Sequence, residues 1–204
     1  MALVCGASGG LGPAVVDAFR TRGDRVLGVA REGADLSVDL TDAGAVEDLW
    51  NGLDAVPRWL VNVTGGFAGG ALAESSPESL RHMLRLNLET GWWSCRAAAT
   101  RMRPGSAIVN VSSRAAVAGS VGSAAYGVAK AGVNRLTEIL AGELKSSGIR
   151  VNAVMPLLID TRANRASMPE AAMKNAVAPE LIARTILWLC SDEAAAVSGA
   201  IVPV

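Results

Sequence analysis

The stretch Leu3-Val4-Cys5-Gly6-Ala7-Ser8-Gly9-Gly10-Leu11-Gly12 near the start of the chain decides the fold. Its apolar beginning predicts a strand and its glycines predict a tight loop. Apolar residues at helical spacing from Val15 to Phe19 then predict a helix. Glycines let the backbone approach a pyrophosphate closely, and the helix N-terminus offers N–H groups and partial positive charge. Ordinary tight turns also use this spacing, so it favours a dinucleotide site without proving one. The residues expected to bind the cofactor here are Gly6, Ser8, Gly9, Gly10, Leu11 and Gly12.

Strands and helices alternate along the rest of the chain. Further apolar runs predict strands at 25–30, 35–40, 59–63, 107–111, 149–155 and 199–204. Helical spacing predicts helices that end near Trp50, that run over 77–97 with or without a break, and that cover 123–144 and 179–190. This order is typical of an α/β fold, a Rossmann-type doubly wound parallel sheet of about seven strands. We expect one domain over 1–204, with ligands at the carboxyl ends of the strands.

Composition narrows the class of partner. The 204 residues include 19 Lys and Arg against 19 Asp and Glu, so no net charge draws the chain to nucleic acid or to an anionic membrane. A small-molecule substrate is therefore the expected partner. The three cysteines are far apart and form no CxxC, which argues against a disulfide framework and a zinc site and fits a reducing cytoplasm. We expect no bound metal, no export signal and no transmembrane span.

The second predicted strand ends at Ala30, Arg31 and Glu32, where this fold meets the adenosine ribose. A carboxylate there binds the 2′-hydroxyl of NAD, whereas an arginine accepts the 2′-phosphate of NADP. Arg31 therefore favours NADP(H), while NAD(H) stays possible because Glu32 is adjacent and Arg31 could instead stack on adenine. Asp39 and Leu40 end the third strand near the expected adenine position, although Asp39 could equally be a simple strand-ending acid.

A second glycine-rich loop follows the fourth predicted strand. Glycines this dense suggest that the backbone comes close to the cofactor rather than that the segment is a linker. The residues expected to contact the cofactor here are Val63, Thr64, Gly65 and Gly66.

Tyr126 and Lys130 are four residues apart and so share one face of the predicted helix. An ammonium beside a phenol favours phenolate, so we expect Lys130 to lower the pKa of Tyr126 toward neutrality and to make it a proton donor and acceptor. Alone, a YxxxK pair is more often a core tyrosine with a solvated lysine. Asn87 is a polar residue among apolar neighbours, and Ser112 and Ser113 end the fifth strand.

Together these motifs resemble the short-chain dehydrogenase/reductase family over essentially the whole chain. Gly6, Gly10 and Gly12 match its glycine motif, with Cys5 where threonine is usual, and 62–65 is similar to its NNAG motif with two departures. Ser113 lies thirteen residues before Tyr126, as the family's catalytic serine does, which favours it over Ser112. The 156–161 segment resembles the family's PGxIxT loop, with leucine for glycine.

The resemblance implies that the protein reduces a carbonyl by hydride transfer. The substrate it implies is a ketone, and 3-oxoacyl compounds are among the candidates. Ser113 would bind the carbonyl oxygen, Tyr126 would donate a proton, Lys130 would bind the nicotinamide ribose, and Asn87 would hold a water behind Lys130. The family's cofactor loop maps onto Pro156, Ile159 and Thr161, with Ile159 and Thr161 contacting the carboxamide. Assembly as a homodimer or homotetramer, through the helices of Trp92 and Tyr126, is also implied.

Two flanking segments are similar to the dihydropteridine reductase branch of the family. These are the loop 65–70 (GGFAGG) and the segment 160–171. That branch lacks the serine and the helix asparagine and has an acid where Arg31 stands. The presence of Ser113 and Asn87 therefore favours a ketone substrate, and the similar flanking segments keep reduction of a quinonoid dihydropterin as the alternative. A nucleotide-binding regulator without turnover is the second alternative, although it would have no chemical need for Ser113, Tyr126 and Lys130 together. Residues 157–177 are the expected substrate loop, in which Asn164, Arg165 and Met168 either line a pocket or order a lid.

Overall fold

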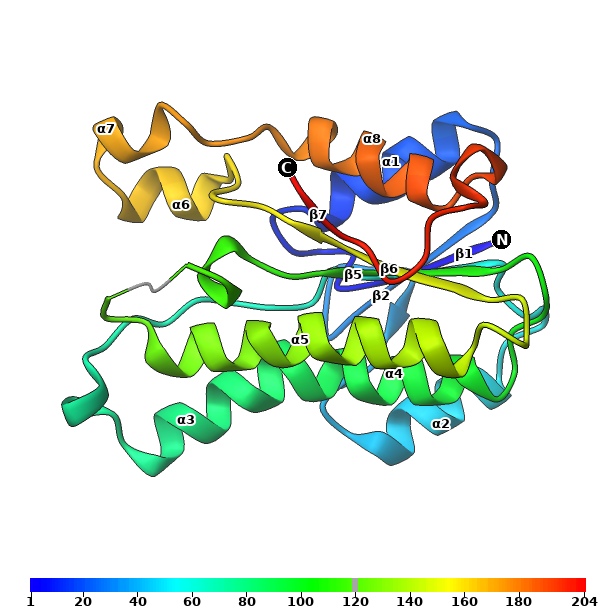
Figure 1. Ribbon diagram of the computed structural model, residues 1–204, viewed down its shortest axis with the longest axis horizontal. Coiled ribbons are helices and arrows are strands. Elements are labelled where there is room, and N and C mark those ends of the chain that lie inside the picture. Colours follow the sequence, from blue (N-terminus) through cyan, green and yellow to red (C-terminus); the bar gives the residue numbers. More distant parts are fainter. Residues whose placement is uncertain (119–120) are drawn as a thin grey trace.

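A seven-stranded, all-parallel sheet forms the centre of the molecule in the computed structural model, which describes residues 1–118 and 121–204 (Figure 1). The strand order is β3-β2-β1-β4-β5-β6-β7, which confirms the predicted doubly wound sheet. The strands are β1 (Ala2–Cys5), β2 (Val26–Ala30), β3 (Leu36–Ser37), β4 (Trp59–Asn62), β5 (Ala107–Val111), β6 (Arg150–Met155) and β7 (Ile201–Pro203).

Helices cover both faces of this sheet (Figure 1). On one face lie α1 (Gly12–Thr21) and α8 (Pro179–Leu189), and on the other α2 (Ala43–Asn51), α4 (Thr90–Ala99) and α5 (Ala124–Glu143). The helix α3 (Pro77–Leu84) leads into α4 and packs beside α5. Shorter elements are η1 (Leu72–Glu74), η2 (Arg85–Glu89), η3 (Arg114–Ala116), α6 (Arg162–Ser167), α7 (Glu170–Met173) and η4 (Asp192–Ala194).

The alternation of side chains along each strand divides the core into two layers. In β1, Ala2 and Val4 pack under α1 and α8, while Leu3 and Cys5 pack under α2 and α4. Because both faces are covered, the central strands are apolar on both sides, as buried parallel strands are. This explains why continuous apolar runs, rather than alternating ones, marked the strands in the sequence.

The expected helix over 77–97 is interrupted. Residues Arg85–Glu89 form a π-helical turn in which the N–H of Thr90 donates to the carbonyl of Arg85, five residues back. The hydroxyl of Thr90 in turn donates to the carbonyl of Leu86 at 3.0 Å. Such turns occur inside helices at functional sites, and this one carries Asn87, which is buried.

The two edge strands are shorter than expected. The third strand has only two residues instead of 35–40, because Asp39 turns the chain by accepting hydrogen bonds from the N–H and hydroxyl of Thr41. The last strand covers Ile201–Pro203 instead of 199–204, since Gly199 has a positive φ and Ala200 donates to the side chain of Asn152. Within the described ranges no helix is both long enough and apolar enough to span a membrane.

Candidate active site

A cleft of about 1020 Å³ opens at the carboxyl ends of the central strands. Its walls come from the loops that follow β1, β2, β3 and β4 and from the start of the α3–α4 segment. That volume is at the upper end for cofactor and ligand pockets, which range over about 300–1,000 Å³. The cleft lies where a doubly wound sheet binds its ligands.

The first glycine loop forms the floor of this cleft. Gly6 has a positive φ of 94°, and a Cβ on it would lie 2.6 Å from the N of Thr64, so only glycine fits there. Gly6, Ser8, Gly9 and Gly10 line the cleft, whereas Leu11 and Gly12 are buried beneath it. Leu11 is the N-cap of α1 and makes no side-chain capping bond, so the partly positive start of this helix is not neutralised by a cap.

Charged side chains gather at the far end of the cleft, after β2 and β3. Arg31, Glu32 and Asp39 are exposed and line it together with the buried Leu40, and Arg85 reaches it from the opposite wall. The Thr41 hydrogen bonds lower the pKa of Asp39, and the charges of Arg31 and Arg85 act in the same direction. Arg85 also donates to the Thr41 hydroxyl at 3.2 Å. Asp39 thus turns the chain after β3 and also lines the cleft, and its contact with adenine stays a prediction.

The second glycine loop is held by Asn87. Its side-chain amide donates to the carbonyl of Gly66 at 2.9 Å and its Oδ1 accepts from the Gly66 N–H at 3.1 Å. A Cβ on Gly65 would lie 2.7 Å from Asn87 Oδ1 and 3.2 Å from Lys130 Nζ. Val63, Thr64 and Gly65 line the cleft. Gly65 is thus the point where the cleft meets Asn87 and Lys130.

The two serines at the end of β5 have different partners. Ser113 is buried, caps η3 by accepting from the Ala115 N–H at 3.2 Å, and forms a side-chain hydrogen bond with Tyr126. Ser112 instead donates to the backbone carbonyl of Lys130 at 3.4 Å. The geometry therefore brings Ser113, and not Ser112, together with Tyr126.

Lys130 is buried, with only 4% of its surface exposed, and its Nζ donates to the carbonyl of Val111 at 2.8 Å. Burial lowers the pKa of this ammonium from 10.5 to about 8. Its Nζ lies 6.0 Å from the centre of the Tyr126 ring.

The expected lowering of the Tyr126 pKa is wrong for this structure. Burial raises the pKa of Tyr126, and the hydrogen bond with Ser113 opposes that rise only in part. The expectation considered only the charge of Lys130, whereas desolvation of the phenol is the larger effect. A phenol with a raised pKa stays protonated at neutral pH, which is the form that donates a proton.

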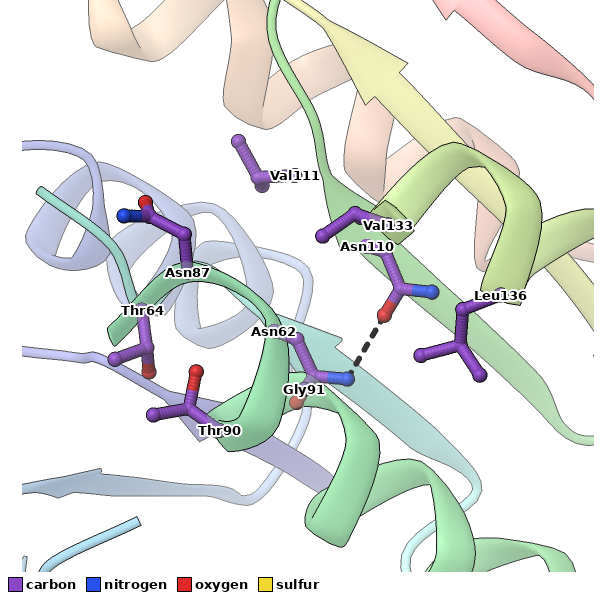
Figure 2. A pocket seen from close by; sticks show the side chains of 9 residues that line it. All are labelled: Asn62, Thr64, Asn87, Thr90, Gly91, Asn110, Val111, Val133 and Leu136. Atoms are coloured by element: carbon purple, nitrogen blue, oxygen red, sulfur yellow. Dashed lines mark hydrogen bonds between the residues drawn. The ribbon is translucent and has the colours of Figure 1, made fainter. Parts of the chain in front are cut away.

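Behind this site lies a small cavity of about 10 Å³, shown in Figure 2. Asn87, Thr64 and Thr90 line it from one side, and Asn62 and Asn110 from the sheet. Asn62 donates to Asn110 at 2.9 Å (the dashed line in Figure 2), and Asn110 donates to the Thr137 hydroxyl at 2.9 Å. This buried chain ties β4 and β5 to α5, which carries Tyr126 and Lys130.

That buried polar chain was not predicted from the sequence. Its signal was present, because both strands place an asparagine at the same register position, Asn62 opposite Asn110. No role was predicted for Phe67 either. Its ring meets the Tyr126 ring edge to face, with centroids 5.2 Å apart and planes at 81°.

The segment after β6 closes the site from the other side. The Pro156 carbonyl accepts from the Arg114 N–H at 2.9 Å, and a Cβ on Gly10 would lie 2.6 Å from Thr161 Cγ2. Thr161 caps α6, and the Ile159 carbonyl accepts from the Asn164 side chain at 2.8 Å. Pro156, Ile159 and Thr161 thus lie between the glycine loop and the end of β5. Residues 157–177 carry the two short helices α6 and α7.

Comparisons with known proteins agree with this geometry. A family model described as enoyl-(acyl carrier protein) reductase matches residues 6–204. The chain is 31% identical over 229 residues to L-xylulose reductase of Bos taurus, covering 100% of this chain and 93% of the relative. It is 30% identical over 231 residues to the 3-oxoacyl-[acyl-carrier-protein] reductase FabG of Vibrio cholerae, covering 98% and 93%.

Solved structures agree as well. An oxidoreductase of the short-chain dehydrogenase/reductase family from Burkholderia thailandensis superposes with a TM-score of 0.87 at 30% identity, covering 100% of this chain and 90% of that one. BdcA in complex with NADPH superposes with a TM-score of 0.89 at 26% identity, covering 100% and 91%. None of these proteins is named a dihydropteridine reductase, so that resemblance stays a prediction from the sequence.

Proposed function

The chain belongs to the short-chain dehydrogenase/reductase family and is an NAD(P)-dependent oxidoreductase, and from that premise we propose that it reduces a ketone carbonyl with NADPH. The observation that carries the proposal is that the side chains of the buried Ser113 and of Tyr126 lie together, with the Nζ of the buried Lys130 6.0 Å from the centre of the Tyr126 ring. This places two hydroxyl donors side by side where the cleft meets Lys130. A non-catalytic regulator would have no use for that arrangement.

The cleft suits a dinucleotide on three counts. The glycine loop presents backbone that side chains would block, the partly positive start of α1 follows that loop without a side-chain cap, and the volume is sufficient. When bound, the nicotinamide supplies the hydride that reduces the carbonyl carbon. Ile159 and Thr161 would contact its carboxamide, and Lys130 its ribose.

The protein's own residues handle the carbonyl oxygen. The Ser113 hydroxyl binds it and polarises the C=O bond, and Tyr126 gives its phenolic proton to the same oxygen. Because burial raises the pKa of Tyr126, the phenol holds that proton at neutral pH. Asn87 holds Gly66 by two hydrogen bonds and so positions the loop that lies beside Lys130.

A substrate panel tests the reaction. NADPH oxidation is followed with ketones, 3-oxoacyl thioesters and a quinonoid dihydropterin, using wild type and Ser113→Ala. We expect turnover of ketones, and a loss of about 100-fold in kcat/KM for Ser113→Ala, as for removal of one oxyanion donor. Binding of NADPH without turnover of any carbonyl would overturn the proposal, and turnover of the dihydropterin alone would favour the alternative.

NADPH is the favoured cofactor because Arg31 lines the adenosine end of the cleft. NADH stays a possible cofactor because Glu32 is there as well. The increase in melting temperature with each cofactor separates the two, since a ligand stabilises in proportion to the logarithm of its concentration over Kd. Equal shifts with NADPH and NADH would count against the preference.

We also propose that the protein assembles as a homodimer or homotetramer. Trp92 on α4, with Val128 and Ile139 on α5, leaves apolar surface exposed on the helices that the sequence resemblance assigns to assembly. Sedimentation velocity at micromolar concentration should give a species of at least two chains. A monomer that is fully active would contradict this.

A further inference from the structure

We infer that an apolar rim, formed by Phe67 beside Tyr126 and by exposed apolar side chains on the loops after β4, β5 and β6, selects a carbonyl substrate with an aromatic or alkyl group next to its C=O and disfavours polyhydroxylated ketones. The inference rests on the proposed function, because it names the substrate class for that site. The relatives are named for both kinds of substrate, since one is an L-xylulose reductase and another a 3-oxoacyl-[acyl-carrier-protein] reductase. The inference says which of these two kinds the present site should prefer.

Phe67 lies directly beside the proposed proton donor. Its ring meets Tyr126 edge to face, and 61% of its surface is nevertheless exposed. An edge-to-face pair leaves one face of an aromatic ring open to a further contact. A group attached to a carbonyl carbon near Tyr126 would therefore reach this ring.

The loop that carries Phe67 is anchored on both sides. Gly66 is held by two hydrogen bonds with Asn87, and the Gly70 N–H donates to the Gly122 carbonyl at 2.7 Å. A Cβ on Gly69 would lie 3.2 Å from the Gly122 oxygen and 3.5 Å from the Phe67 ring, so the loop packs tightly there. Phe67 is thus held in place, as a residue that forms a binding wall must be.

Other exposed apolar side chains stand on the same side of the molecule. They follow β4, β5 and β6, whose carboxyl ends are adjacent in the sheet. Because these strand ends meet at one edge of the sheet, the loops that carry the side chains lie at the same edge as the loop of Phe67. The residues are Leu72, Val117, Val121 and Leu157.

Two polar side chains of the segment 157–177 are already engaged within that segment. Asn164 donates to the Ile159 carbonyl, and Arg165 makes two hydrogen bonds to the Asp160 carboxylate. Of the three residues proposed from the sequence to line a pocket, only Met168 offers an apolar, adaptable side chain. Hydroxyls that lose water without gaining a partner weaken binding, so a polyhydroxylated substrate is disfavoured.

A matched pair of ketones tests the inference, an aryl methyl ketone and an acyclic polyhydroxylated ketone of similar size. We expect wild type to prefer the aryl ketone by about 100-fold in kcat/KM, as burial of one large apolar group implies. Phe67→Ala should lower kcat/KM for the aryl ketone by about 30-fold more than for the polyhydroxylated ketone, so that most of the preference is lost. Phe67→Leu should keep most of the preference, and Val56→Ala, at an exposed apolar residue far from the rim, should change neither.

A binding measurement keeps the inference separate from the proposed function. Calorimetry gives the Kd of the corresponding aryl alcohol and polyol in the presence of NADP⁺, without any turnover. Tighter binding of the aryl alcohol, weakened by Phe67→Ala and by Leu157→Ser, would support the apolar rim even if no ketone were reduced. Preference of wild type for the polyhydroxylated ketone, or equal loss on both ketones in Phe67→Ala, would overturn it.

Discussion

The two ends of the cleft are built differently. At the catalytic end, Lys130, Asn87 and Ser113 are buried, and each bonds to the backbone. At the end where we propose that adenosine binds, which we call the adenosine end, Arg31 and Asp39 are exposed to solvent. Buried groups with fixed partners interact strongly, whereas exposed charges are screened by water and salt. The catalytic end should therefore control whether the reaction occurs, and the adenosine end only which cofactor is chosen.

The largest expected effect tests the catalytic end. Tyr126→Phe removes the proton donor while keeping the ring against Phe67, so kcat should fall by about 1,000-fold. Steady-state NADPH oxidation measures this, and NADPH binding by fluorescence should change little. A kcat within tenfold of wild type would show that another group donates the proton.

A pH series tests the burial of Lys130. Its pKa is about 8 in the folded state against an ordinary 10.5, so between these values the unfolded chain holds a proton that the folded protein lacks. Stability of wild type relative to Lys130→Met should therefore rise with pH across this window, by about 3 kcal/mol in all. Urea unfolding at several pH values measures the difference.

The buried cysteines act in the opposite direction in the same series. Burial raises the pKa of Cys5, Cys95 and Cys190 from 9.0 to about 12, so the folded protein keeps protons that the unfolded chain releases, and stability falls as the pH rises above 9. This decline is common to wild type and Lys130→Met and cancels in their difference. If the difference in unfolding free energy between wild type and Lys130→Met stayed constant between pH 8 and pH 10, Lys130 would not be desolvated.

A pair of glycine variants tests how closely the catalytic end is packed. In Gly65→Ala the new methyl group would meet Asn87 Oδ1 and Lys130 Nζ, and we expect kcat to fall by about tenfold to 100-fold, as for a misplaced catalytic group. Gly70→Ala is the control, because no neighbouring atom lies within 4 Å of its Cβ position. Equal activity of the two variants would refute the close packing.

The smallest expected effect is at the adenosine end. Arg31→Gln should reduce the preference for NADPH over NADH by about tenfold in Kd and reduce the salt dependence of NADPH binding, since one exposed charge contributes about 1 kcal/mol. Arg135→Gln, which removes an exposed arginine paired with Glu138, is the matched control. A loss as large as that of Tyr126→Phe would contradict the contrast between the two ends.

The sequence predicted the fold well because local patterns determine it. Apolar runs such as 107–111 mark strands buried on both faces, and glycines mark the loop before α1. The edge strands were predicted too long, since their ends depend on single hydrogen bonds such as those of Asp39 and Asn152.

The site was predictable only where its residues are close in the sequence or match a motif. Ser113, Tyr126 and Lys130 come together in the structure, and their spacing had suggested this. The contact of Phe67 with Tyr126 joins a loop and a helix that are far apart in sequence, and the Tyr126 pKa depends on burial by the whole fold. No local pattern encodes either quantity.

The π-helical turn at Arg85–Glu89 has a consequence for how related chains are aligned. Successive α-helical residues are about 100° apart around the axis. One extra residue in the turn therefore rotates the side chains of α3 relative to those of α4 by about this angle. Deleting one residue from this turn would move the face of α3 by about that angle while α4 stayed in place. A relative whose alignment requires a one-residue gap here would present a different side chain to Gly66, whatever its overall identity.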